Sequence, residues 1–138
     1  MMISTKGRYA LKVMVELATA DPDKYISLKS IAEKEGISDK YLEAIIKQLV
    51  QGKMVMGLRG KGGVYRLAKD PSLCTVGEII RLSEGSLSPV SCLDCQDDAS
   101  CPRSDDCLTL PVWQGLDNVV NEYLNGITLE DIIKKNGK

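Results

Sequence analysis

The sequence of 138 residues contains no histidine and no phenylalanine, and its aromatic side chains come from one tryptophan and five tyrosines. Without histidine, a zinc site with mixed cysteine and histidine ligands and any all-nitrogen metal site are excluded. Because aromatic residues are few, a core must be packed mainly from aliphatic side chains. Hydrophobic residues make up 43% of the chain, which is enough for one or two small domains.

Long hydrophobic runs are absent as well. No stretch approaches the roughly 18 consecutive apolar residues that suggest a transmembrane helix, so we expect no membrane partner. The first residues lack the apolar core of a signal peptide, because Lys6, Arg8, Lys12 and Glu16 interrupt them. We therefore expect a cytoplasmic protein whose thiols stay reduced.

The net charge of −1 conceals a difference between the two halves of the chain. Residues 1–70 contain 13 Lys and Arg against 8 Asp and Glu, which gives +5. Residues 71–138 contain 5 against 11, which gives −6. A basic half suggests contact with a polyanion, although a solvated basic face would give the same surplus.

The basic half has the pattern of a helix-turn-helix. Apolar residues at helical spacing predict a first helix over residues 5–19. Ser27 and Ser38 are suitable N-caps for a second and a third helix, and Gly36 closes the second one. A short helix, a tight turn and a further helix form the layout in which the last helix enters the major groove. Helical hairpins that bind no DNA show the same pattern.

A glycine-rich hairpin follows the third helix. Two strand-like runs, residues 55–59 and 64–67, flank the turn Gly60-Lys61-Gly62-Gly63. Three helices followed by a hairpin with a basic tip predict a winged helix-turn-helix DNA-binding domain over residues 1–72. The predicted fold class is mainly α with a small β-hairpin wing. An exposed loop with incidental charge is the alternative to a wing.

The predicted DNA contacts come from three places. On the third helix, Lys40 would reach phosphate or guanine and Glu43 would accept from cytosine. Basic residues of the wing would approach the minor groove, whose negative potential attracts them, and two more basic residues open the first helix. The candidates are Ser38, Asp39, Lys40, Tyr41, Glu43, Ala44, Lys47, Arg59, Lys61, Lys6 and Arg8. In a protein that binds no DNA, the same charges would form a solvated helix face.

The acidic half, residues 73–138, predicts a dimerisation region. Thr75 with Glu78 indicates a capping box that opens a helix, and Cys74 before it is expected near the core. After a loop, a long amphipathic helix is predicted, and Thr128 then caps a last helix. Such a long helix is too apolar to stand alone, so we expect a homodimer with two-fold symmetry, which suits a palindromic operator in double-stranded DNA. Its apolar residues include Leu108, Val112, Leu116, Val119, Tyr123 and Leu124.

Four of the five cysteines lie in a cysteine-rich loop, residues 91–107. The residues between them are mostly Asp, Ser, Pro and Gln, which cannot build a core. Clustered thiols in a chain expected to stay reduced indicate a metal or redox site. The spacing matches neither a ferredoxin nor a zinc ribbon. An iron–sulfur cluster is our main interpretation, and zinc, a thiol–disulfide sensor and inert cysteines remain alternatives.

Four motifs stand out along the chain. They are Ser4-Thr5-Lys6-Gly7-Arg8-Tyr9-Ala10, Tyr41-Leu42-Glu43, Arg59-Gly60-x-Gly62-Gly63-x-Tyr65, and Cys107-Leu108-Thr109 with Trp113. Together these motifs resemble the IscR/CymR/NsrR family of bacterial regulators, also called the Rrf-two family. The resemblance covers nearly the whole chain, ending near Lys135, and implies a dimeric winged-helix transcription factor, usually a repressor. No acid–base pair or phosphate-binding glycine loop supports catalysis, so we expect no enzyme.

The resemblance also implies a ligand set. Cluster-bearing members hold a [2Fe–2S] or [4Fe–4S] centre on three cysteines that match Cys95, Cys101 and Cys107. Their fourth ligand is a histidine or an acidic residue, at positions occupied here by Leu110 and Arg8. Cys92 is therefore the candidate fourth ligand. Cluster loss through oxygen, nitric oxide or iron shortage would alter transcription, so the protein would sense iron–sulfur status or redox and nitrosative stress.

Three alternatives compete with cluster sensing. The loop would sense oxidants through disulfides such as Cys92–Cys95 or Cys101–Cys107. A regulator similar to CymR would instead be controlled by a partner enzyme or a metabolite, with incidental cysteines. A small iron–sulfur electron-transfer protein would leave the basic wing unexplained.

Overall fold

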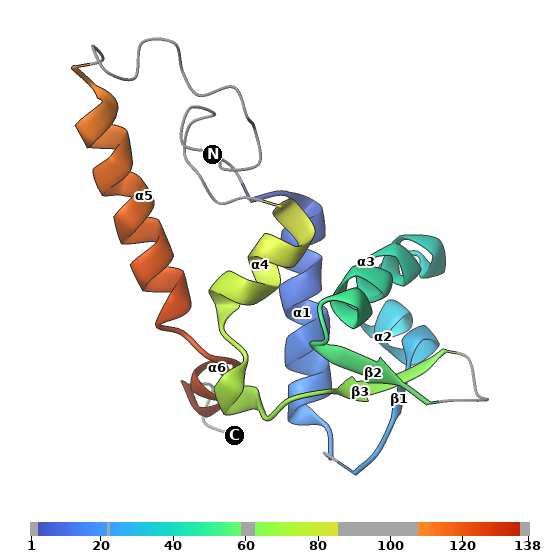
Figure 1. The fold of residues 1–138 in the computed structure, drawn as a ribbon. Helices are drawn as coiled ribbons and strands as arrows, with labels where there is room; N and C mark the ends of the chain where they lie inside the picture. The colour runs from blue at the N-terminus through green and yellow to red at the C-terminus, as the bar shows by residue number, and fades with distance from the viewer. Residues whose placement is uncertain (1–2, 22, 59–62, 86–107, 136–138) are drawn as a thin grey trace.

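The computed structural model describes residues 3–21, 23–58, 63–85 and 108–135. Figure 1 shows a compact head in which the first three helices and a small sheet lie on one side of the molecule, and one long helix stands apart on the other. The chain is mostly helical and has a three-stranded antiparallel sheet, which confirms the predicted fold class.

Helix α1, Thr5–Thr19, forms the centre of the head and has the predicted bounds. Its N-cap is Ser4, whose side chain accepts a hydrogen bond from the Gly7 N–H at 3.3 Å. One face of the helix is buried in the hydrophobic core, as the apolar spacing predicted. The core-facing residues of α1 are Ala10, Val13, Met14 and Leu17.

Helices α2, Leu28–Glu35, and α3, Asp39–Gln51, form the predicted helix-turn-helix. Ser27 and Ser38 cap them, each accepting from the backbone N–H three residues further on, at 3.0 and 3.2 Å. Gly36 ends α2 at φ 68°, a left-handed conformation that glycine adopts without strain. The predicted caps and the glycine turn are therefore confirmed.

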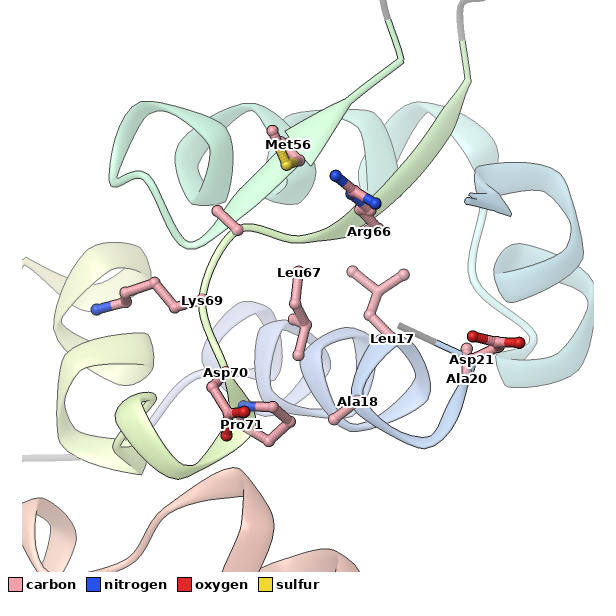
Figure 2. A pocket seen from close by; sticks show the side chains of 11 residues that line it. Leu17, Ala18, Ala20, Asp21, Met56, Arg66, Leu67, Lys69, Asp70 and Pro71 are labelled. Atoms are coloured by element: carbon pink, nitrogen blue, oxygen red, sulfur yellow. The ribbon is translucent and has the colours of Figure 1, made fainter. Parts of the chain in front are cut away.

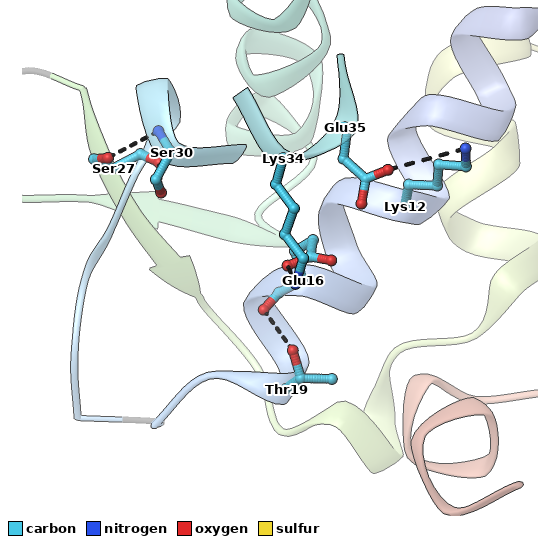
Figure 3. A network of polar contacts seen from close by, with 7 residues as sticks. All are labelled: Lys12, Glu16, Thr19, Ser27, Ser30, Lys34 and Glu35. Carbon is cyan, nitrogen blue, oxygen red and sulfur yellow. Dashed lines mark hydrogen bonds and ion pairs between the residues drawn. The ribbon is translucent and has the colours of Figure 1, made fainter. Parts of the chain in front are cut away.

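Two ion pairs join α2 to α1 on the surface of the head (Figure 3). Lys34 Nζ lies 2.9 Å from Glu16 Oε2, and Lys12 Nζ lies 3.9 Å from Glu35 Oε2. The Glu16 hydrogen bond and charge raise the pKa of Lys34 above its usual value. Both lysines are well exposed, so these pairs add little stability.

The sheet contains β1, Ile26–Ser27, β2, Val55–Gly57, and β3, Val64–Leu67, in the order β1-β3-β2. Strand β3 has the predicted bounds, whereas β2 ends at Gly57 rather than at residue 59. The hairpin still continues past β2, because the Leu58 N–H donates to the Val64 carbonyl at 3.2 Å. Strand β1 was not predicted, since two residues carry no recognisable alternation.

The head leads through the 3₁₀ turn η1, Pro71–Leu73, into α4, Val76–Glu84. Thr75 caps α4 as predicted by accepting from the Glu78 N–H at 3.2 Å. The Glu78 carboxylate lies 3.2 Å from Lys69 Nζ, so it is engaged in an ion pair on the helix surface.

The last helix, α6, Leu129–Lys135, is tied to the start of α4. The Leu129 N–H donates to the Cys74 carbonyl at 2.9 Å, and Thr75 and Thr128 form an antiparallel bridge. Cys74 and Leu129 are both fully buried, as the sequence predicted for Cys74. The C-terminal helix is thus a part of the head.

Helix α5, Leu110–Asn125, stands apart from this core (Figure 1). None of its residues is buried. It starts two residues later than the predicted apolar pattern, because Leu108 lies outside the helix and is 94% exposed. Its contact with α4 includes two polar bonds, from the Arg81 guanidinium to Asn121 Oδ1 at 2.5 Å and to Asn125 Oδ1 at 2.9 Å. Over the described part of the chain, no helix has the length and apolarity needed to cross a membrane.

Candidate nucleic-acid interface and cysteine-rich loop

The predicted DNA contacts on α3 share one exposed face. Helical periodicity separates them from the buried residues of the same helix, which include Leu42, Ile45 and Leu49. Because the Ser38 cap holds the first turn of α3 in place, this face has a fixed start at the helix-turn-helix corner. The exposed set consists of Ser38, Asp39, Lys40, Tyr41, Glu43, Ala44 and Lys47.

Tyr41 is both a surface residue and a packing residue. Its ring meets that of Tyr9 edge to face, with centroids 5.9 Å apart and planes at 87°. Tyr41 remains 37% exposed, and Lys12 Nζ lies 5.5 Å from the centroid of the Tyr9 ring. Edge-to-face packing of this kind fixes ring orientation. The start of α3 is therefore positioned directly by the second turn of α1.

The two basic candidates at the start of α1 lie in different surroundings. Lys6 is half-buried, whereas Arg8 is exposed and donates to Thr5 Oγ1 at 3.3 Å. Thr5 lines a shallow groove together with Tyr9 and Tyr41. Arg8 borders a neighbouring groove with Glu35 and Ile132, so Arg8 and the exposed face of α3 do not line the same groove.

At the wing, Arg59 and Lys61 lie outside the described residues. The described part of the wing adds a basic residue that the sequence analysis missed, Arg66 on β3. Its guanidinium stacks 5.0 Å from the centroid of the Tyr25 ring, and Met56 faces it on β2. The strand pattern could have predicted the exposure of Arg66. Side chains alternate between the two faces of a strand, and Tyr65 and Leu67 pack against the core, so Arg66 between them faces the other way.

Arg66 borders a cavity of about 410 Å³ between the end of α1, the sheet and η1 (Figure 2). In Figure 2, Leu17 of α1 lies beside Leu67 and Ala18 lies below it, whereas Met56 and Arg66 lie above it. Lys69 and Asp70 line the same cavity, and Asp70 Oδ1 accepts from the Ser72 N–H at 2.9 Å. These hydrogen bonds lower the pKa of Asp70.

The predicted metal ligands Cys92, Cys95, Cys101 and Cys107 lie outside the described residues. Among the residues that are described, no group of three or more His, Cys, Asp or Glu side chains could hold a metal ion. Cys74 is unsuited to that role, because it is fully buried, its Sγ lies 3.6 Å from the Asp70 carbonyl, and burial raises its thiol pKa.

Among the residues considered as ligands, only the loop cysteines have the chemistry to bind an iron–sulfur cluster. Leu110 is a hydrocarbon at the first position of α5 and offers no ligand atom. Arg8 is a cation, and its guanidinium is turned to Thr5. With no histidine in the chain, the four loop cysteines are the soft ligands that remain.

Comparison with known proteins agrees with this geometry. Residues 3–135 match the family model described as "Rrf2: Iron-dependent Transcriptional regulator". The chain is 36% identical over 133 residues to the HTH-type transcriptional regulator IscR of Yersinia enterocolitica, covering 96% of this chain and 79% of that protein.

Two solved structures of similar proteins have the same fold. The structure of CymR, the global cysteine regulator of B. subtilis, has a TM-score of 0.77 and 38% identity, covering 98% of each chain. The structure of T. potens IscR has a TM-score of 0.78 and 37% identity, covering 99% of this chain and 88% of that one. These identities are close to each other, so they do not separate an IscR type from a CymR type. The matches extend over nearly the whole chain, and the protein belongs to the Rrf2 family of transcriptional regulators.

Proposed function

We propose that this protein is a homodimeric repressor that binds a palindromic operator, and that an iron–sulfur cluster on its cysteine-rich loop controls this binding. Residues 1–72 contain the DNA-binding unit and residues 73–138 the dimerisation region, within which α4 and α6 pack on the head and α5 supplies the interface. The observation that carries the dimeric part is the apolar surface of α5, which no other segment of the described chain covers.

The apolar stripe on α5 runs the length of the helix. Val112, Leu116, Val119 and Tyr123 are between 43% and 67% exposed, and they recur at helical spacing. A soluble protein rarely leaves such a contiguous apolar patch in water. A second α5 packed across a two-fold axis would cover it and would bring two heads into a fixed relation. Two α3 helices one helical turn of DNA apart then match a palindromic operator.

The DNA-binding part rests on the exposed face of α3 and on the basic residues around it. Lys40 and Glu43 stand in the first two turns of α3, where side chains of a recognition helix reach base edges. Lys47 stands one turn further and suits a phosphate contact. Lys6, Arg8 and the wing residues Arg59 and Lys61 supply further contacts to the sugar–phosphate backbone or the minor groove.

The regulatory part rests on the chemistry and the position of the loop cysteines. Cys95, Cys101 and Cys107 hold the cluster, and Cys92 supplies the fourth thiolate. A bound iron–sulfur cluster supplies a centre that oxygen, nitric oxide and iron shortage can destroy. The loop connects α4 to α5, so holding its cysteines together constrains both helices. A coupling free energy of about 1–3 kcal/mol is typical of such linkage between two sites.

The test uses protein purified without oxygen. Iron, sulfide and visible absorption are measured first. The affinity for a duplex selected by the protein from a randomised pool is then compared for cluster-loaded and cluster-free protein at matched salt. We expect iron and sulfide in the anaerobic protein and an affinity difference of roughly tenfold. Protein without iron and sulfide, or equal affinities of both forms, would contradict cluster control.

A thiol sensor is the second candidate, and Leu110 favours it. A family member with a hydrocarbon at this position lacks one usual ligand, and pairs of loop cysteines would instead form disulfides under oxidants. Thiol titration before and after mild peroxide, on protein whose iron content is known, separates the two. Loss of two or four thiols with a reversible change in DNA affinity, in iron-free protein, supports this candidate.

A further inference from the structure

The C-terminal end of α4 is bonded to the N-terminal end of α1. Glu84 is the last residue of α4, and its Oε1 accepts a hydrogen bond from the Ser4 N–H at 2.9 Å. The Ser4 hydroxyl donates a short hydrogen bond to the same oxygen and also accepts one from the Gly7 N–H. Ser4 therefore links the carboxylate to the first turn of α1.

The glycine at position 7 leaves room for this carboxylate. A β-carbon on Gly7 would overlap Glu84 Oε1 and would lie 3.3 Å from the carboxyl carbon. Gly7 is buried within α1, where glycine is normally unfavourable because of its backbone entropy. A side chain at this position would therefore have to displace the end of the Glu84 side chain and would also lie 3.2 Å from Ile3 Cγ2.

Helix dipoles favour the same pairing. A carboxylate at the C-terminal end of α4 is repelled by the partial negative charge of its own helix. The N-terminal end of α1 carries the opposite partial charge and donates to Glu84 through Ser4. Ile3 adds an apolar contact beside this bond, since it packs against Val76 and Ile80 of α4.

The first turn of α1 is adjacent to the proposed DNA contacts. Lys6 lies within that turn and Arg8 directly after it. Tyr9 then meets Tyr41 at the start of α3. A contiguous set of contacts thus runs from Glu84 through Ser4 and α1 to the recognition helix, and packed side chains of this kind can carry coupling between distant residues.

We propose that Glu84 is a positioning residue for DNA binding, holding the first turn of α1 so that Lys6 and Arg8 reach the DNA backbone and Tyr9 supports α3. This inference rests on the proposed DNA-binding function. Glu84 makes no contact with DNA itself. It acts through Ser4, and Gly7 provides the space for its carboxylate.

The main experiment compares DNA binding of four full-length proteins: wild type, Glu84→Ala, Glu84→Gln and Glu78→Gln. The probe is the duplex that the wild-type protein selects from a randomised pool, measured over a series of salt concentrations. Glu78→Gln is the matched control, because it removes the same charge from α4 at a residue that pairs with Lys69. Removing an acidic charge should by itself tighten DNA binding. The proposal predicts instead that removing the charge of Glu84 weakens DNA binding.

We expect Glu84→Ala to weaken binding about tenfold and to lower the slope of log affinity against log salt by about 1, the effect of one lost phosphate contact. Glu84→Gln should lie between Glu84→Ala and wild type, because its amide oxygen can still accept from Ser4. Glu78→Gln should bind as wild type does or slightly more tightly. All affinities are compared below the onset of thermal unfolding of each protein, so loss of folded protein does not enter the result.

A double-mutant cycle tests the packing on which the proposal depends. Gly7→Ala should destabilise the wild-type protein, although alanine stabilises an unobstructed helix relative to glycine. In the Glu84→Ala background the carboxylate is gone and the contact with Ile3 Cγ2 at 3.2 Å remains, so Gly7→Ala should be clearly less destabilising than in the wild-type background. An equal effect of Gly7→Ala in both backgrounds would show that Glu84 does not occupy this space and would overturn the proposal.

The outcomes distinguish a failure of the proposed role of Glu84 from a failure of the proposed DNA-binding function. If the wild-type protein selects no duplex, the proposed function fails and the role of Glu84 fails with it. If the wild-type protein binds DNA and Glu84→Ala binds with the same affinity and salt slope, only the role of Glu84 is refuted. Weaker binding with a lower salt slope in Glu84→Ala alone supports the proposal.

Discussion

Helices α4 and α5 have similar apolar patterns but opposite surroundings. Both carry apolar residues at helical spacing, although Thr75 caps α4 with its side chain and Thr109 makes no such bond at the start of α5. In α4, Val76, Ile79 and Ile80 are buried, whereas no residue of α5 is buried. The periodicity of a sequence thus predicts that a helix has an apolar face, but it does not identify the surface that covers this face.

The contact between the two helices shows the same contrast. Arg81 of α4 donates to Asn121 and Asn125 of α5, and Gly77 leaves room for the Asn125 side chain. Leu124 of α5 also packs against Val76 and Ile80 of α4, so this end of α5 is attached by polar and apolar contacts together. The exposed apolar stripe of α5 takes no part in this attachment and remains available for the proposed second subunit.

The largest expected effect tests whether the two apolar faces differ as described. Ile79→Ala in α4 should lower the free energy of unfolding by about 2–5 kcal/mol, because the side chain is fully buried and a cavity remains. Val119→Ala in α5 should cost much less, and its cost should depend on protein concentration if the proposed second subunit covers α5. Urea unfolding at two protein concentrations, roughly tenfold apart, measures both. A concentration-independent loss for Val119→Ala as large as that for Ile79→Ala would contradict the difference between the helices.

A charge on the α5 stripe should separate the subunits. Leu116→Asp places a carboxylate in the proposed dimer interface, so we expect monomers by sedimentation and an operator affinity about 100-fold weaker, because the two heads then bind independently. Leu73→Asp is the matched control, since Leu73 is also exposed, at 62%, but lies in η1. It should remain dimeric. Dimers of Leu116→Asp with unchanged affinity would show that α5 is not the interface.

A loop cysteine and a buried cysteine should respond differently to substitution. Cys101→Ala should remove iron and sulfide and abolish the roughly tenfold affinity difference between cluster-loaded and cluster-free protein, without lowering the stability of the head. Cys74→Ala should keep the iron and lower stability by about 1 kcal/mol, because Cys74 is buried against the core. Anaerobic metal analysis and thermal unfolding of both variants check this.

Cys92→Ala sharpens the same test. If Cys92 is the fourth ligand, its loss should change the visible absorption of the reconstituted protein, because the cluster then needs another ligand. An unchanged spectrum and iron content would exclude Cys92 and leave the cluster with three cysteine ligands.

Local chemistry explains why much of the head could be predicted from the sequence. The caps at Ser27 and Ser38 and the left-handed turn at Gly36 each depend on residues within four positions along the chain. The bounds of α1 and β3 follow from periodicity in the same way. The exposed face of α3 was predictable because it is the complement of the buried stripe.

The missed features depend on residues that are far apart in the sequence. Strand β1 exists because Ile26 and Ser27 pair with Tyr65 and Val64 of the wing. The hydrogen bond between Ser4 and Glu84 joins residues 80 positions apart, and no local sequence pattern at either residue predicts it. The sequence motif that contains Gly7 is recognisable from the sequence. The contact between Gly7 and the Glu84 carboxylate is visible only in the structure.

The smallest expected effect compares one carboxylate cap in each half of the chain. Asp70 accepts from Ser72 at the start of η1, and Asp131 Oδ2 accepts from the Thr128 N–H at 3.0 Å at the start of α6. The backbone and side-chain hydrogen bonds of these neighbours lower the pKa of both groups below the usual value of 3.8. A lowered folded pKa means that each carboxylate stabilises the fold fully above the unfolded value, and that this stabilisation is lost as the pH falls through the folded pKa.

Asp70→Asn and Asp131→Asn should therefore be less stable than wild type at about pH 6, and this deficit should shrink toward about pH 2. Asparagine still accepts the cap hydrogen bonds, so the deficit should be small and should reflect the charge alone. Because η1 and α6 pack against each other, the double variant measures whether the two caps are coupled. Urea midpoints across this range measure the change. A deficit that stays constant with pH would show that the hydrogen bonds do not favour the charged form. The negative charges of Asp70 and Asp131 would then not contribute to the stability of η1 and α6.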